Sequence, residues 1–176
     1  VEYLRMDALA DMLVQVGFGE KAAQDQIQTF EKTRKDILVH TKYEESIWPI
    51  EADPAKIKNI IMNLVVNALH GMPDGGDLHI RTQNVVLDNN SLKSLDHKPG
   101  KYVKLTILDT GIGMDKATMH RVFEPFFTTK KMGPQKGTGL GLSLSYKLVK
   151  ENDGQIRVDN MAGEGATFSL RMPIAC

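Results

Sequence analysis

The stretch "KYVKLTILDTGIGM", residues 101–114, joins a strand pattern to two glycines through one acidic residue. Successive side chains of a strand point to opposite faces of a sheet. The apolar side chains that share one face are Val103, Leu105 and Ile107. Asp109 continues the same register, so we predict a carboxylate on the core side of the strand, where burial is unfavourable without a partner.

Two interpretations of Asp109 follow from its surroundings. An aspartate that ends a strand commonly accepts a hydrogen bond from the backbone two residues later, here at Gly111, in an Asx turn. A carboxylate also suits an exocyclic amine such as that of adenine, and Gly111 and Gly113 would let a flat ligand pack against bare backbone. The local sequence leaves both interpretations open.

A second glycine-rich stretch, "KGTGLGLS" at residues 136–143, precedes a helical pattern over 140–151. Its G-x-G-x-G spacing matches neither the dinucleotide fingerprint nor the Walker A loop. A helix N-terminus behind glycines presents unpaired N–H groups and a partial positive charge, which suit a phosphate. The alternative is a flexible loop in front of a helix.

The segment 54–70 predicts a helix, because Asp53 and Pro54 form a cap followed by a first-turn proline. Asparagines at 59, 63 and 67 repeat every four residues along the margin of its apolar face, and His70 lies one turn further on. Asparagine is a poor helix former, so the stripe is either a solvated edge or a row of polar groups that faces a ligand. An asparagine oxygen can ligate Mg²⁺ when phosphates supply the other ligands.

Composition limits the class of protein. The chain has 176 residues, 41% hydrophobic and 25% charged, with zero formal net charge. These values are ordinary for a globular protein and predict no nucleic-acid surface and no membrane contact through a basic patch. The single cysteine, Cys176, excludes an internal disulfide framework and suits a reducing compartment. The longest apolar run, residues 60–69, is too short to span a bilayer, and we expect a cytoplasmic domain, whether or not its parent is membrane-attached.

Strand and helix patterns together predict an α/β two-layer sandwich, a mixed sheet with helices on one face. The expected helices are 1–16, 20–34, 54–70, 115–123 and 140–151, and the expected strands are 36–43, 77–87, 101–109, 154–160 and 166–173. We expect residues 1–25 to be a helical segment outside a single larger domain at 26–176. Because the sequence begins in a helical pattern, we expect a fragment of a longer protein, with a homodimer through residues 1–16.

Five short motifs occur in an order that resembles a known family. Asn67 in "NLVVNA", then "DTGIGM", "FEPFF", "GTGLGL" and "GEGATFSLRMP" resemble the N, G1, F, G2 and G3 boxes of the sensor histidine kinase ATP-binding domain. That domain belongs to the Bergerat-fold (GHKL) superfamily, whose sheet is mainly antiparallel. The resemblance covers residues 27–174. The sequence of these motifs is most similar to that of bacterial sensor kinases of the PAS-containing or hybrid type.

The resemblance implies Mg-ATP binding and assigns roles to residues. Asn67 would ligate Mg²⁺ with Asn63 near the nucleotide, His70 would contact phosphate, and Asp109 would accept from the adenine amine. Gly111 and Gly113 would lie beside the base. Lys130 would reach the phosphates from a lid, and the segment that wraps them would comprise Gly137, Thr138, Gly139, Leu140, Gly141 and Leu142.

The resemblance also implies transfer of the γ-phosphate to a histidine on a separate helical dimerisation domain, with a response regulator further downstream. None of the five histidines in this chain resembles that phosphoacceptor site, and no catalytic residue is assigned. Ala166 stands where relatives carry a hydroxyl, and Thr167 should face the opposite side of its strand.

Two further functions are compatible with the same motifs. One is a nucleotide-binding or scaffold module without kinase activity, and the other is a GHKL-type ATPase. ATPases of the superfamily use a glutamate as general base one turn before the metal-binding asparagine. Asn63 occupies that position and cannot take up a proton near neutral pH. We therefore expect negligible ATP hydrolysis by this chain alone.

Overall fold

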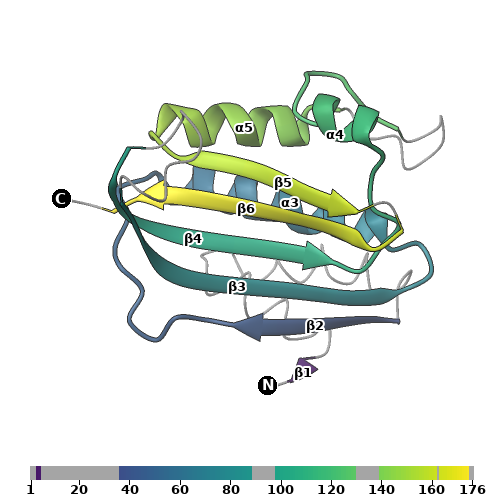
Figure 1. Ribbon diagram of the computed structural model, residues 1–176, viewed down its shortest axis with the longest axis horizontal. Coiled ribbons are helices and arrows are strands. Elements are labelled where there is room, and N and C mark those ends of the chain that lie inside the picture. Colours follow the sequence, from purple (N-terminus) through teal and green to yellow (C-terminus); the bar gives the residue numbers. More distant parts are fainter. Residues whose placement is uncertain (1–2, 5–35, 89–97, 130–138, 162, 175–176) are drawn as a thin grey trace.

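The computed structural model describes residues 3–4, 36–88, 98–129, 139–161 and 163–174. Figure 1 shows a twisted sheet with its helices packed above and behind it. The strands are β1 (Tyr3–Leu4), β2 (Ile37–Lys42), β3 (Gly76–Leu87), β4 (Gly100–Asp109), β5 (Gln155–Met161) and β6 (Gly165–Pro173). The helices among the described residues are α3 (Pro54–Gly71), α4 (Lys116–Arg121) and α5 (Gly141–Glu151).

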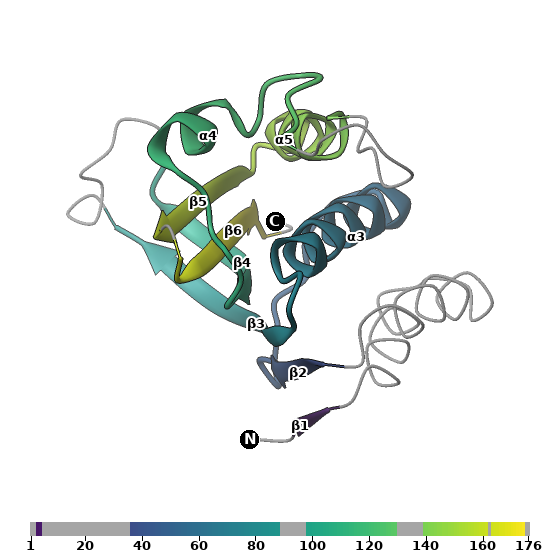
Figure 2. The same ribbon diagram turned by 90° about the vertical axis from the view of Figure 1, so that its right-hand side faces the viewer.

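The six strands form one sheet in the order β1-β2-β3-β4-β6-β5. β2 and β3 run parallel, and the other four neighbouring pairs are antiparallel. A parallel pair needs a long crossover connection, usually a helix, and α3 provides it between β2 and β3. The predicted mixed, mainly antiparallel sheet with helices on one face is confirmed, and Figure 2 shows α3 and α5 on the same side of the sheet.

The core lies between the helices and one face of the sheet. From α3 it receives Ile60, Leu64, Val65, Ala68 and Leu69, and from the sheet Val39, Leu78, Ile80, Ile107, Phe168, Leu170 and Met172. These strand residues alternate with more exposed ones, as expected where only one face of a strand is buried. The apolar face predicted for helix 54–70 is therefore the face that covers the sheet.

Helix α3 begins and ends where local sequence chemistry predicts. The Asp53 carboxylate accepts a hydrogen bond from the Ala55 N–H at 2.8 Å, Pro54 follows in the first turn, and the helix ends at Gly71. This carboxylate satisfies an N–H group that has no partner inside the helix. The helix predicted at 140–151 is observed as α5, and the one at 115–123 is shorter, as α4.

The N-terminal prediction is wrong where it can be compared. Tyr3–Leu4 form strand β1 on the edge of β2, with Tyr3 opposite His40, and not the start of a helix. An edge strand offers unpaired backbone groups that a short segment can join, a tertiary effect that helical periodicity does not report. The rest of helices 1–16 and 20–34, and the predicted boundary after residue 25, lie outside the described residues.

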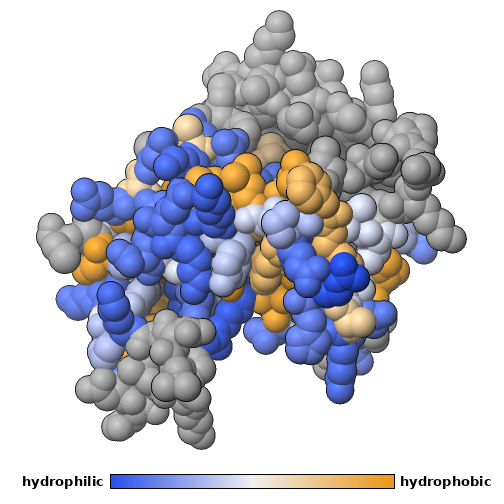
Figure 3. All heavy atoms as spheres, turned by 90° about the horizontal axis from the view of Figure 1, so that it is seen from above, coloured by the Kyte–Doolittle hydropathy of each residue, from blue (hydrophilic) through white to orange (hydrophobic). Residues whose placement is uncertain are grey.

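Apolar side chains are exposed on the surface around α5. Figure 3 looks onto the α4 and α5 side and shows apolar residues gathered among hydrophilic ones. Large apolar side chains exposed at the start and along the outer face of α5 include Leu140, at 40%, and Leu144, at 48%. No helix within the described part of the chain is long and apolar enough to cross a membrane.

Candidate functional site

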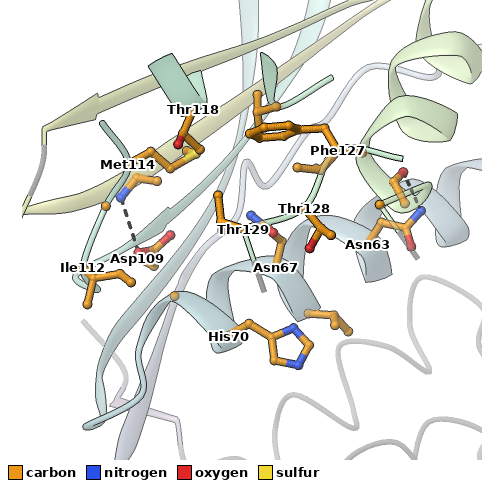
Figure 4. Close-up of a pocket in the computed structure, with 18 residues that line it drawn as sticks. Asn63, Asn67, His70, Asp109, Ile112, Met114, Thr118, Phe127, Thr128 and Thr129 are labelled. Carbon is orange, nitrogen blue, oxygen red and sulfur yellow. Dashed lines mark hydrogen bonds between the residues drawn. The ribbon is translucent and has the colours of Figure 1, made fainter. Parts of the chain in front are cut away.

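A pocket of about 470 Å³ opens where the C-terminal half of α3, the end of β4 and the start of α5 meet. Figure 4 shows its labelled side chains converging from these elements and from the segment after α4. The sequence-predicted residues that line it are Asn63, Asn67, His70, Asp109, Gly113, Gly139, Gly141 and Leu142. Motifs more than 70 positions apart in the sequence thus contribute to one cavity.

Asp109 lies at the base of this pocket and is only 3% exposed. Its Oδ1 accepts hydrogen bonds from the backbone N–H of Gly111 at 3.0 Å and of Ala166 at 3.3 Å. Among the described residues both bonds end on Oδ1, which leaves Oδ2 to accept from a ligand. The Asx turn and the ligand acceptor are therefore compatible, because they use different oxygens of one carboxylate.

Burial controls the charge of this group. It raises the pKa of Asp109 above its ordinary value, and this effect is larger than the opposing effect of the N–H groups of Gly111 and Ala166. A desolvated carboxylate is easier to protonate. A ligand that donates a hydrogen bond to the carboxylate would favour the ionised form.

Gly111 does not line the pocket, unlike the neighbouring Gly113, and its glycine character has another cause. A Cβ at position 111 would overlap the backbone carbonyl of Gly71, whose oxygen accepts from the Ile112 N–H at 2.8 Å. The loop after β4 is therefore hydrogen-bonded directly to the end of α3. This contact holds the two walls of the pocket together.

The asparagine stripe on α3 divides into two parts. Asn59 is exposed and belongs to the solvated edge. Asn63 donates through Nδ2 to the Gly141 carbonyl at 3.1 Å and to the Ser145 hydroxyl at 3.2 Å, so it links α3 to the N-terminal part of α5. Asn67 and His70 line the pocket further along the helix, as Figure 4 shows.

The glycine-rich stretch enters the pocket at the N-terminus of α5. Gly139 has a φ of 67°, and its carbonyl accepts from the Phe126 N–H at 3.0 Å. This bond joins the two chain segments that flank residues 127–138. Leu140 is 40% exposed and does not line the pocket. Lys130, Gly137 and Thr138 lie outside the described residues.

Several lining residues were not singled out in the sequence. They are Val66, Gly71, Ile112, Met114, Thr118, Val122, Thr128 and Thr129. Thr128 and Thr129 directly follow the "FEPFF" motif, and that adjacency was the available signal. Met114 is fixed by Asn160, whose side chain accepts from the Met114 N–H at 2.6 Å and donates to its carbonyl.

The three phenylalanines of "FEPFF", at positions 123, 126 and 127, separate in space. Phe123 packs edge-on against Phe168, with ring centroids 6.4 Å apart. Phe126 is 74% exposed with a φ of 64°, and Phe127 lines the pocket with the Arg121 guanidinium 4.5 Å from its ring centroid. Of these three phenylalanines, Phe127 is therefore the one that can contact a molecule in the cavity.

Strand β6 completes the pocket as the strand period predicts. Ala166 lines the cavity, and its N–H reaches Asp109. Thr167 pairs with Leu108 in the register of β6 and β4 and points to the other face of the sheet. Position 166 therefore contributes its backbone N–H to the pocket, and no hydroxyl.

Known proteins share both sequence and fold with this chain. The profile of the family described as "Histidine kinase-, DNA gyrase B-, and HSP90-like ATPase" matches residues 52–175. The sensor kinase CckA of Brucella abortus is 39% identical over 79% of this chain and 15% of its own length. Sporulation kinase E of Bacillus subtilis is 35% identical over 74% of this chain and 15% of its own length.

The fold agrees with solved catalytic domains. The catalytic domain of histidine kinase ThkA matches with a TM-score of 0.67 and 22% identity, over 99% of this chain and 97% of that one. Full-length ShkA in complex with AMPPNP matches with a TM-score of 0.65 and 21% identity, over 99% of this chain and 32% of that one. The chain spans about 15% of the length of the curated relatives named above. It belongs to the histidine kinase-, DNA gyrase B- and HSP90-like ATPase family, and within that family it is an ATP-binding catalytic domain of the sensor histidine kinase type.

Proposed function

We propose that this domain holds Mg-ATP in the pocket between α3, β4 and α5 and donates the γ-phosphate to a histidine on a separate helical domain of its parent kinase. The phosphate would then pass to a response regulator, and the domain would act in the cytoplasm. One observation carries the proposal. The nearly buried carboxylate of Asp109 and the amide of Asn67 line the same cavity from different elements.

The Asp109 end of the cavity suits an adenine ring. The carboxylate accepts hydrogen bonds and donates none when ionised. It would accept from the exocyclic amine of adenine and would repel the carbonyl oxygen that guanine carries at the corresponding position. Gly113, Ile112 and Met114 line this part of the pocket and offer a flat, mostly apolar surface to the base.

The α5 end suits the phosphates. The N–H groups at the start of α5 carry a partial positive charge, and Gly141 and Leu142 line the pocket there. The neutral Asn67 oxygen fits Mg²⁺ when phosphate oxygens supply the negative ligands. The metal would neutralise charge on the transferred phosphoryl group. We propose phosphate contacts for His70, Lys130 and the segment 137–142 on the family resemblance.

Transfer to an outside acceptor is favoured over hydrolysis. The side chain at the position of the expected general base is Asn63, which has no basic oxygen and whose amide donates to Gly141 and Ser145. Catalysis would therefore rest on positioning and charge neutralisation. The purified chain should release no more than trace phosphate from Mg-ATP in a continuous phosphate-release assay, and steady turnover would favour an ATPase.

The deciding experiment supplies the missing acceptor. The chain is mixed with γ-³²P-labelled Mg-ATP and a separately produced histidine-bearing helical domain from a sensor kinase that this chain resembles. We expect an acid-labile, alkali-stable phosphate on the acceptor, and none when its histidine is replaced. At ATP concentrations below the dissociation constant of the parent chain, Asp109→Asn should reduce the labelling by about 10–100-fold.

The scaffold alternative gives a different pattern. A domain that binds nucleotide without kinase activity would show ATP binding in calorimetry but no label on any acceptor. A domain that has lost nucleotide affinity would show neither. Running both assays on one preparation therefore separates the proposed kinase from both scaffold functions.

A further inference from the structure

A second cluster of polar side chains lies on the opposite face of the sheet from the pocket. His40 is on β2, and Asp77 and His79 are on the adjacent parallel strand β3, where His40 stands opposite His79. Their neighbours Val39 and Leu78 are 1% and 0% exposed in the core. Because side chains alternate between faces, the three polar groups point away from α3.

The three side chains are close enough to share one ligand. His40 Nε2 lies 2.5 Å from Asp77 Oδ1, and the imidazole rings of His40 and His79 stack with centroids 4.4 Å apart and an interplanar angle of 12°. One donor atom from each residue falls within 4.8 Å of the other two. The side chain of His40 is only 11% exposed, whereas that of Asp77 is 40% exposed and has room to turn.

Two imidazoles and one carboxylate form a donor set with a defined preference. Imidazole suits Zn²⁺, Cu²⁺ and Ni²⁺, whereas Mg²⁺ and Ca²⁺ favour oxygen ligands alone. Tetrahedral Zn²⁺ with bonds of about 2.0–2.1 Å separates its ligand atoms by about 3.3 Å. The His40–Asp77 contact of 2.5 Å would have to open by about 0.8 Å, and the longer separations, which are within 4.8 Å, would have to close by up to about 1.5 Å. Side-chain rotation of the exposed Asp77 and His79 can provide these movements.

We infer that His40, Asp77 and His79 form a binding site for a transition-metal ion of the Zn²⁺ class, distinct from the Mg-ATP pocket. The metal would take the place of the proton that His40 and Asp77 share, with water as the fourth ligand. The metal ion would cross-link β3 to β2, the strand next to the edge strand β1.

The backbone connects this cluster to the other face of the sheet. The Asp77 N–H donates to the Thr110 hydroxyl at 2.9 Å, and the Thr110 N–H donates to the Asp77 carbonyl at 3.1 Å. Thr110 directly follows Asp109. A metal that fixes Asp77 would thereby also fix the backbone at the base of the nucleotide pocket.

The test is a titration of Zn²⁺ into the whole, nucleotide-free chain by calorimetry, in buffer with excess Mg²⁺. We expect one saturable site per chain that Mg²⁺ does not block. His79→Ala and Asp77→Asn each remove a ligand and should weaken Zn²⁺ binding by at least about 100-fold, since even loss of an outer-shell partner costs about 10–100-fold. His79 is exposed, so its truncation should leave the fold intact, which circular dichroism checks.

Two matched controls remove other zinc-binding side chains. His120→Ala takes away an exposed imidazole on α4, and Cys176→Ser takes away the only thiol. Both should keep the parent affinity within about twofold. As a second readout, Co²⁺ should give the intense visible absorption of a four-coordinate site in the parent and lose it in His79→Ala. Absence of saturable Zn²⁺ binding, equal binding in His79→Ala, or loss of binding in a control would overturn the inference and leave the cluster as a hydrogen-bonded pair beside a stacked ring.

Discussion

Asp109 is the residue on which recognition of the base depends. Replacing it by Asn keeps an oxygen that can accept from Gly111 and Ala166 but presents an amide, in place of a carboxylate, to the ligand. A hydrogen bond to a charged group contributes about 1.5–3 kcal/mol. We therefore expect Asp109→Asn to weaken Mg-ATP binding by about 10–100-fold in calorimetry.

The control for that variant is Asp115→Asn. Asp115 caps α4 by accepting from the Thr118 N–H at 2.7 Å, and asparagine caps a helix about as well as aspartate. This variant should bind Mg-ATP like the parent. An unchanged dissociation constant in Asp109→Asn would remove the proposed contact with adenine.

The raised pKa of Asp109 predicts how stability depends on pH. A carboxyl whose pKa is higher in the folded state than in the unfolded state binds its proton more tightly when folded. Its contribution to stability is therefore most favourable below the unfolded pKa and decreases as pH rises through the interval up to the folded pKa. Wherever the carboxyl is ionised, its burial destabilises the domain.

The destabilising effect of the ionised Asp109 carboxylate can be measured by removing its charge. Without nucleotide, Asp109→Asn should unfold at the same or a higher temperature than the parent at pH 7, and this advantage should shrink as the pH falls and the parent carboxyl, with its raised pKa, takes up its proton. Thermal unfolding followed by circular dichroism over this pH range is the measurement. A variant that is clearly less stable at pH 7 would mean that the carboxylate stabilises the empty fold.

At the scale of elements, the junction of α3 with the loop after β4 depends on a close backbone approach. Gly111→Ala places a Cβ against the Gly71 carbonyl, so the loop or the helix end must move. We expect a loss of about 2–4 kcal/mol in the free energy of unfolding by urea denaturation. Gly163→Ala is the control, because position 163 has open space and only the strain of its φ of 83°, about 1–2 kcal/mol. Equal losses in both would contradict the steric explanation.

The junction of α3 with α5 depends on one amide. Asn63→Ala removes the hydrogen bonds to Gly141 and Ser145, the latter fully buried, and should cost about 1–3 kcal/mol. Asn59→Ala on the same helix removes an exposed amide and should be neutral or slightly stabilising, because alanine is the better helix former. Chemical denaturation compares the two. If Asn59→Ala costs as much as Asn63→Ala, the amide does not act as the fastener between the helices.

The elements differ in how far sequence could predict them. Helix α3 follows from Asp53, Pro54 and the apolar spacing, all of which act within a few residues. Strand β1 could not be predicted, because two residues acquire strand geometry only from the exposed edge of β2. The separation of the three phenylalanines was also not predictable, since the left-handed backbone at Phe126 accompanies its bond to Gly139, thirteen positions away.

In the candidate site too, local sequence patterns predicted some features, whereas others depend on tertiary packing. Periodicity placed Asp109 on the core face of β4, and the helical repeat placed Asn63 and Asn67 on one side of α3. The repeat could not distinguish Asn59, which is solvated, from Asn63, which binds α5, because that distinction depends on where α5 packs. Nor could it show that Gly111 serves helix packing more than the ligand.

For the whole molecule, nucleotide binding should stabilise the fold. The pocket is built from α3, β4, β6 and α5, so a ligand that binds only the folded chain opposes separation of all four elements. A non-hydrolysable Mg-ATP analogue at about 100 times its dissociation constant should add about 2.7 kcal/mol to the free energy of unfolding. A thermal-shift series with Asp109→Asn as control measures this, and an unshifted parent chain would favour a scaffold.

The central claim is that Asp109 and Asn67 bind opposite ends of one nucleotide. A crystal structure of this chain with Mg²⁺ and a non-hydrolysable ATP analogue tests it most directly. We predict the adenine amine within hydrogen-bond distance of the Asp109 carboxylate and the Asn67 side-chain oxygen in the coordination shell of the Mg²⁺ ion. A nucleotide bound elsewhere, or bound in this pocket without contact to either side chain, would contradict the account.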